Sequence, residues 1–175
     1  MREVMQRTAD AMVAEGCPLT GVLYGGLMKT RDGVKVIEFN ARFGDPETEV
    51  VLPLLRSDIF DIFYNIAEGA PVGEVEWSDA ATLGVVVASK GYPGSYDKGF
   101  VIRGTERAGA AGCRVYHMGT ALRDGELVTA GGRVAIVVAE GETLAAAREK
   151  AYEGVAQIGC DNLFHRGDIG NKAFL

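Results

Sequence analysis

Two stretches, one near each end of the chain, space their apolar positions as helices do. Within residues 1–13, apolar side chains recur near every third or fourth position, which predicts an amphipathic helix that stops at Gly16. The alanine-rich stretch 144–158 predicts another helix, with Thr143 as its N-cap and Gly159 at its end. Most of the strand patterns in the sequence lie between these two helices.

A β-hairpin is expected soon after the first helix. An apolar run over 22–28 and a stretch of strand-like composition over 34–40 flank a turn that contains an Asp-Gly pair at 32–33. Because side chains alternate between the two faces of a strand, Glu38 and Asn40 then point to the same face of the second strand.

Two short helices are expected after the hairpin. Asp45 can cap a helix whose first residue is Pro46, and Pro53 kinks or ends that helix. Ser57 can cap the next one, which covers 58–68 and is followed by glycine.

Strand patterns dominate beyond residue 80. Runs rich in β-branched residues cover 82–88 and 133–138, and the runs 115–122 and 126–129 flank an Asp-Gly turn at 124–125. Residues 70–80, which lie between the part with helices and the part with strands, show no clear period in their apolar positions. We therefore expect an α+β protein with two parts, 1–70 and 71–175, the second being a small β-rich domain with one packed helix.

Composition narrows the class of protein. The chain is 47% hydrophobic and 24% charged, which is typical of a well-cored globular protein. A net charge of −6 without a basic segment speaks against nucleic acid as a partner, and the lack of a long apolar run speaks against a membrane partner. The three cysteines, Cys17, Cys113 and Cys160, are widely spaced, which favours free thiols in a reducing cytoplasm.

The candidate chemistry lies at the end of the second hairpin strand. Glu38 and Asn40 offer two hard oxygen donors on one face, of the kind that Mg²⁺ prefers. Arg42 follows, and its guanidinium group could meet a phosphate or a carboxylate. From these residues alone, an arginine near acidic residues is more often part of a surface ion pair, and Asp45 could serve only as a helix cap.

The same stretch resembles a known family. Residues 24–49 (YGGLMKTRDGVKVIEFNARFGDPETE) are similar to the end of the ATP-grasp domain of phosphoribosylamine–glycine ligases, also called glycinamide ribonucleotide synthetases. The run Glu-Phe-Asn followed by Phe-Gly-Asp-Pro-Glu is the most specific part. Further segments that resemble the small C-terminal domain of this family lie at 83–94, 117–120, 129–134 and 168–170.

The resemblance implies an ATP-dependent ligation of glycine to phosphoribosylamine through a glycyl phosphate. Glu38 and Asn40 would hold Mg²⁺ (or Mn²⁺) against the phosphates of ATP, and Arg42 would act as the catalytic cation on phosphate or acyl phosphate. Asp45 and Glu47 would contact substrate. The reaction would take place in the cytoplasm.

Several features that the family places upstream are not found in these 175 residues: a glycine-rich lid loop, lysines for the ATP phosphates and an N-terminal substrate domain. We therefore expect the chain to need a missing N-terminal portion and to be inactive in isolation. Two alternatives stay open. One is another ATP-grasp enzyme, such as a carboxylase, and the other is a non-catalytic module that binds a nucleotide or a partner.

Overall fold

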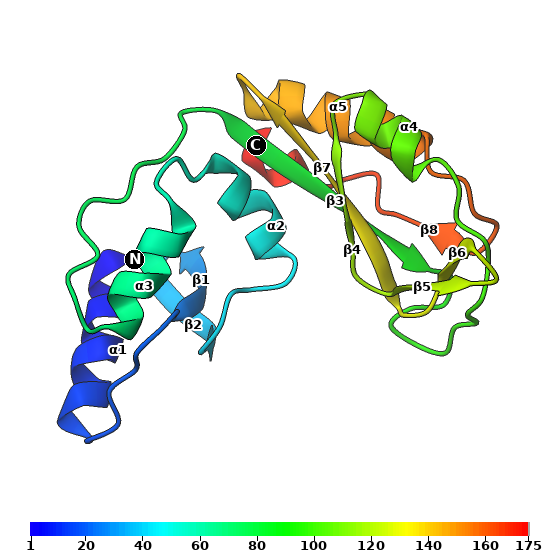
Figure 1. Cartoon of the computed structure of the whole chain (residues 1–175). Coiled ribbons are helices and arrows are strands. Elements are labelled where there is room, and N and C mark those ends of the chain that lie inside the picture. The colour runs from blue at the N-terminus through cyan, green and yellow to red at the C-terminus, as the bar shows by residue number, and fades with distance from the viewer. Residues whose placement is uncertain (175) are drawn as a thin grey trace. The chain divides into compact units, whose positions relative to one another are not determined.

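The structure is a computed structural model that describes residues 1–174 (Figure 1). Its elements form an α+β protein, as predicted. The chain divides into two compact units. The N-terminal unit comprises Met1–Thr48 and Leu55–Trp77, and the C-terminal unit comprises Glu49–Leu54 and Ser78–Leu175. Within the described residues, no helix is long and apolar enough to cross a membrane.

The N-terminal unit is built from two helices and a hairpin. The antiparallel strands β1 and β2 form the expected hairpin, and the first helix ends next to Gly16, whose φ of 75° suits glycine. The elements are α1 (Arg2–Ala14), β1 (Tyr24–Thr30), β2 (Gly33–Asn40) and α3 (Ile59–Ala67).

The helices between the hairpin and residue 70 differ from the prediction at their starts. Helix α2 covers Glu47–Val51, so it begins one residue after Pro46, and Pro53 lies in the 3₁₀ turn η1 (Leu52–Leu54) that follows. The N-cap of α3 is Asp58 and not Ser57, because the Asp58 carboxylate accepts a hydrogen bond from the Phe60 amide at 2.7 Å.

The C-terminal unit is a four-stranded antiparallel sheet in the order β4-β7-β3-β8, with helices α4 and α5 on one face (Figure 1). A separate hairpin, β5-β6, turns at Asp124 and Gly125, which both have positive φ. The elements are β3 (Ala81–Ser89), α4 (Thr105–Ala110), β4 (Arg114–His117), β5 (Thr120–Arg123), β6 (Glu126–Thr129), β7 (Arg133–Gly141), α5 (Leu144–Ala156), β8 (Leu163–Phe164) and η2 (Asn171–Phe174).

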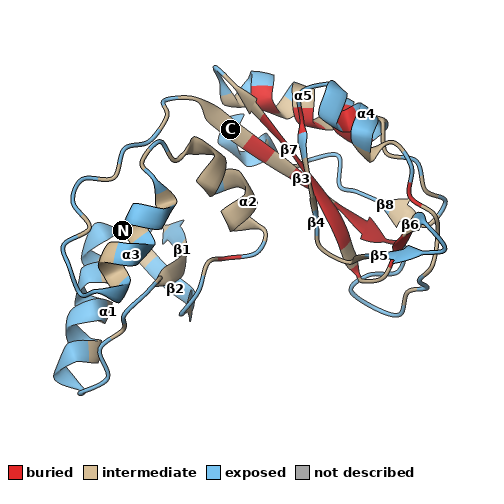
Figure 2. Ribbon diagram, in the orientation of Figure 1, coloured by how far each residue is buried: buried red, intermediate tan, exposed pale blue. Residues whose placement is uncertain are grey.

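The main core lies in this C-terminal unit, along β3 and β7 (Figure 2). Val85 and Val137 are fully buried beneath α5, which presents Ala147 and Ala151 to them. Small side chains on the helix let it approach the sheet closely, and the Thr143 hydroxyl caps it as predicted. The apolar run 133–138 of the sequence lies in β7, which is buried on both sides.

One prediction for this unit was wrong. The run 115–122 is not one strand, because it breaks at Gly119, whose Cα packs against Gly131; β4 then pairs with β7 while β5 pairs with β6. The expected free state of all three cysteines is confirmed.

Candidate functional site

The two predicted metal ligands lie side by side at the end of β2. The amide Nδ2 of Asn40 lies 3.2 Å from Oε1 of Glu38, and both side chains are solvent-accessible. Across the hairpin, Asn40 pairs with Tyr24 and Glu38 pairs with Gly26. A Cβ on Gly26 would lie only 3.1 Å from Cγ of Glu38, so the glycine leaves room for the glutamate to lie over β1.

A β-bulge separates these residues from the rest of the hairpin. The register shifts between Gly26 and Leu27, whose partners are Glu38 and Val36, so that Ile37 has no direct partner on β1. Bulges re-aim side chains and are frequent next to active sites. The bulge therefore sets Glu38 and Asn40 apart as a local group at the strand end.

Arg42 and Asp45 lie in the loop that follows β2. The Arg42 guanidinium donates a hydrogen bond to the Phe43 carbonyl at 2.6 Å, and its side chain is exposed. Asp45 is also exposed. Arg42 is therefore turned back onto its own loop in this structure, and no ion pair between Arg42 and the Glu38 carboxylate is seen in the part of the chain that the structure describes.

Glu47 occupies a more enclosed position than the other predicted site residues. Its carboxylate lies over Gly44, which is buried, and beside the ring of Tyr24. Gly44 is held in turn by Thr48, whose amide and hydroxyl both donate to the Gly44 carbonyl. The first turn of α2, which carries Glu47, thus fixes the loop that contains Gly44.

Tyr24 belongs to this group, although the sequence pattern did not single it out as a site residue. Burial raises the pKa of its hydroxyl, and the negative charge of Glu47, a hydrogen bond to that carboxylate and the charge of Glu38 raise it further. Only the hairpin register could have indicated Tyr24, because it stands opposite Asn40.

The chemistry of this group suits a divalent cation with oxygen ligands. Glu38 and Asn40 supply two adjacent hard donors, and Glu47 adds negative charge close to Tyr24, the cross-strand partner of Asn40. Residues 1–174 contain no group of three or more His, Cys, Asp or Glu side chains placed to hold a metal. A cation held here would therefore keep water or phosphate oxygens as its other ligands, which is the habit of Mg²⁺.

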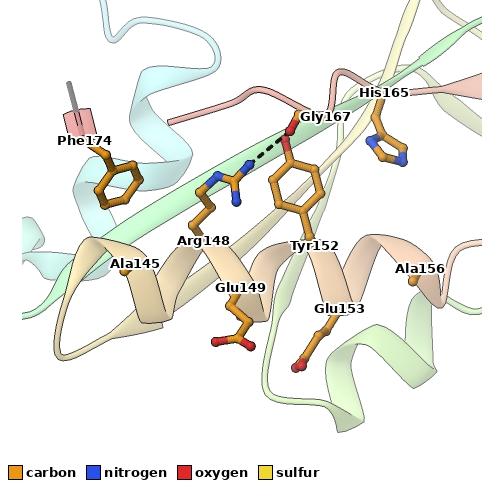
Figure 3. Close-up of a pocket in the computed structure, with 9 residues that line it drawn as sticks. All are labelled: Ala145, Arg148, Glu149, Tyr152, Glu153, Ala156, His165, Gly167 and Phe174. Carbon is orange, nitrogen blue, oxygen red and sulfur yellow. Dashed lines mark hydrogen bonds between the residues drawn. The ribbon is translucent and has the colours of Figure 1, made fainter. Parts of the chain in front are cut away.

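A hollow of about 870 Å³ in the C-terminal unit lies elsewhere and contains none of the predicted residues (Figure 3). Arg148 of α5 donates to the carbonyls of Gly167 and Ile169 at 3.0 and 2.9 Å, and its guanidinium lies over the ring of Tyr152. The Tyr152 hydroxyl donates to the Arg166 carbonyl at 2.8 Å. These polar groups dock the segment after β8 onto α5.

The chain is similar to proteins of one family along most of its length. Residues 1–48 match the model of the phosphoribosylglycinamide synthetase ATP-grasp (A) domain, and residues 82–172 match that of the phosphoribosylglycinamide synthetase C domain. The chain is 49% identical over 173 residues to a phosphoribosylamine–glycine ligase of Halalkalibacterium halodurans, covering 99% of this chain and 40% of that protein. It is 48% identical to the human trifunctional purine biosynthetic protein adenosine-3, covering 97% of this chain and 17% of that protein.

Solved structures support the same relationship. The crystal structure of a phosphoribosylamine–glycine ligase from Thermotoga maritima matches with a TM-score of 0.85 and 34% identity, over 97% of this chain and 42% of that one. The chain thus spans about two fifths of the single-enzyme relatives that it matches. The ATP-grasp model matches the first part of the chain and the C-domain model matches the second part, which is the order of the resemblances found in the sequence. The chain therefore belongs to the phosphoribosylglycinamide synthetase family of purine-biosynthetic ligases.

Proposed function

We propose that this chain supplies the metal-binding strand and the C domain of an enzyme that ligates glycine to phosphoribosylamine at the expense of ATP. The observation that carries the proposal is the adjacent pair Glu38 and Asn40 on β2, within a segment that matches the ATP-grasp domain of the family. Because the chain spans about two fifths of its single-enzyme relatives, the complete reaction requires the portion of the enzyme that this chain lacks.

The proposed role of each residue follows from its charge and from the charge of the group that it would contact. Glu38 and Asn40 would hold Mg²⁺ or Mn²⁺, which neutralises charge on the transferred phosphoryl group. Arg42, once it leaves the Phe43 carbonyl, would pair with phosphate or with the glycyl phosphate. Asp45 and Glu47 would contact the amino groups of the substrates. The reaction belongs to the cytoplasm.

The proposed division of labour places residues 1–70 in the ATP-grasp domain and residues 71–175 in the small C-terminal domain. The matched ranges, 1–48 and 82–172, support this assignment. The stretch between them carries α3 and the segment that leads to β3.

The first alternative is a different ATP-grasp reaction. An N5-carboxyaminoimidazole ribonucleotide synthetase from Thermotoga maritima matches with a TM-score of 0.59, but its 17% identity supports a shared fold only. The second alternative is a non-catalytic module that binds a nucleotide or a partner. A substrate-dependent assay separates these three functions.

The test uses the Halalkalibacterium halodurans relative with its matched segment replaced by this chain. We expect ATP turnover by this chimera to depend on glycine and phosphoribosylamine and not on bicarbonate. Glu38→Gln should lower kcat/KM about 100-fold and raise the Mg²⁺ concentration needed for activity, because it removes a charged metal ligand. Glu74→Gln, which changes an exposed acid in the same unit, is the matched control.

Three results would contradict the proposal: turnover that follows bicarbonate, an inactive chimera, or a Glu38→Gln chimera as active as the control. Calorimetric titration of Mg-ATP into the 175-residue chain complements the assay. We expect no binding, since most of the ATP site would lie in the missing portion. Binding that Glu38→Gln abolishes would show instead that the chain forms an ATP site without that portion.

A further inference from the structure

The Glu47 carboxylate has two neighbours, Tyr24 and Gly44, that substrate contact by Glu47 alone would not require. The three residues come from β1, the loop after β2 and the start of α2. They lie in contact although Tyr24 is separated from the other two by some twenty positions of sequence.

Gly44 provides the space in which the Glu47 carboxylate lies. A Cβ on Gly44 would overlap Oε2 of Glu47 and would stand 3.2 Å from Cζ of Tyr24, the ring carbon that bears the hydroxyl. Gly44 does not have a left-handed backbone, so this position needs glycine for its space and not for its φ. The carboxylate and the phenol therefore meet above the glycine backbone.

Gly44 and Tyr24 are each fixed in place by contacts with a different element. The Gly44 carbonyl accepts hydrogen bonds from the amide and hydroxyl of Thr48, which fixes the loop to the first turn of α2. On the other side, Tyr24 is anchored in the hairpin opposite Asn40. A hydrogen bond from the Tyr24 hydroxyl would then fix the carboxylate relative to the strand that carries Glu38 and Asn40.

We propose that Tyr24 is a positioning residue, which holds the Glu47 carboxylate over Gly44 in the orientation that receives an amino group of the substrate. The inference rests on the proposed function, because Glu47 contacts substrate only there. A tyrosine hydroxyl is protonated at neutral pH, so the Tyr24 phenol can donate a hydrogen bond to the Glu47 carboxylate.

The contact itself can be tested in the 175-residue chain. Incorporation of 3-fluorotyrosine gives one ¹⁹F NMR signal for each of the six tyrosines, and Tyr24→Phe identifies the signal of Tyr24. We expect Glu47→Gln and Gly44→Ala each to lower the pH at which the Tyr24 signal titrates, while the other five signals stay in place and report an intact fold. An unchanged Tyr24 titration in Glu47→Gln would overturn the contact.

The positioning role is tested in the chimeric enzyme by a double-mutant cycle. Tyr24→Phe should raise KM for an amino substrate about 10-fold and leave kcat less affected, which is a typical effect of removing a group that orients a ligand-binding side chain. The same change in a Glu47→Gln background should add less than about 2-fold, because the carboxylate that Tyr24 would orient is then absent. Tyr64→Phe, which alters an exposed tyrosine of the same unit, should change KM less than 2-fold.

Equal losses from Tyr24→Phe in both backgrounds, or full activity of Tyr24→Phe, would overturn the positioning role. A chimera that is inactive with the unchanged segment would overturn the proposed function and the positioning role with it. The ¹⁹F titration would still decide the contact by itself, so the two failures are distinguishable.

Discussion

Replacement of Gly154 by alanine sets two measurable effects against each other. Gly154 lies inside α5 and is buried. In an exposed helix, glycine to alanine stabilises by about 1 kcal/mol. Here the new Cβ would lie 2.5 Å from Sγ of Cys113 and 2.9 Å from Cγ1 of Val137, and Val137 is fully buried.

Packing should outweigh helix propensity at this position. Favourable contacts between heavy atoms lie at about 3.5–4.0 Å, so the methyl group would intrude by about 1 Å on atoms that are themselves enclosed. Overpacking of this kind costs about 1–3 kcal/mol. After subtraction of the propensity gain, we expect a net loss of up to about 2 kcal/mol, or a fall of up to about 8 °C in Tm for a chain of this size.

Urea unfolding followed by far-UV circular dichroism measures this change. The matched control is Gly109→Ala in α4, where a new Cβ would meet nothing within 4 Å, so a gain of up to about 1 kcal/mol is expected. Adding Cys113→Ala to Gly154→Ala should recover part of the loss, because the two side chains compete for one space. A Gly154→Ala chain as stable as the Gly109→Ala chain would refute the reasoning.

Two further predictions follow from local interactions. Asp58→Ala should destabilise α3 by about 1 kcal/mol because it removes the N-cap, whereas Ser57→Ala should not produce this helix-specific loss in amide hydrogen exchange of the first turn of α3. Burial raises the pKa of the Cys113 thiol in the folded state above its ordinary value of 9.0. The stability due to the neutral thiol is then complete below pH 9.0 and is lost as the pH rises, so urea midpoints should fall less steeply between pH 8 and 10 in Cys113→Ala.

The features that the sequence determined by itself are local in the chain. The hairpin turn, the helix at residues 1–13 and the Thr143 cap of α5 each depend on residues within a few positions of one another, and all three were found as predicted. The adjacency of Glu38 and Asn40 also follows from the period of a single strand. Their proposed roles as metal ligands stay a prediction.

Tertiary structure decided the features that depend on distant partners. Ser57 and Asp58 are both good N-cap residues, but only Asp58 caps α3. The Ser57 hydroxyl instead accepts a hydrogen bond from the Glu76 amide, 19 residues away. At the strand break, Gly119 lies close to Gly131, whose amide donates to the Gly119 carbonyl at 3.0 Å. The meeting of Tyr24 with Glu47 likewise requires the hairpin to be folded against the start of α2. A periodic pattern predicts the face of a helix or strand on which a residue lies. The residues that this face contacts are determined only when separate elements pack together.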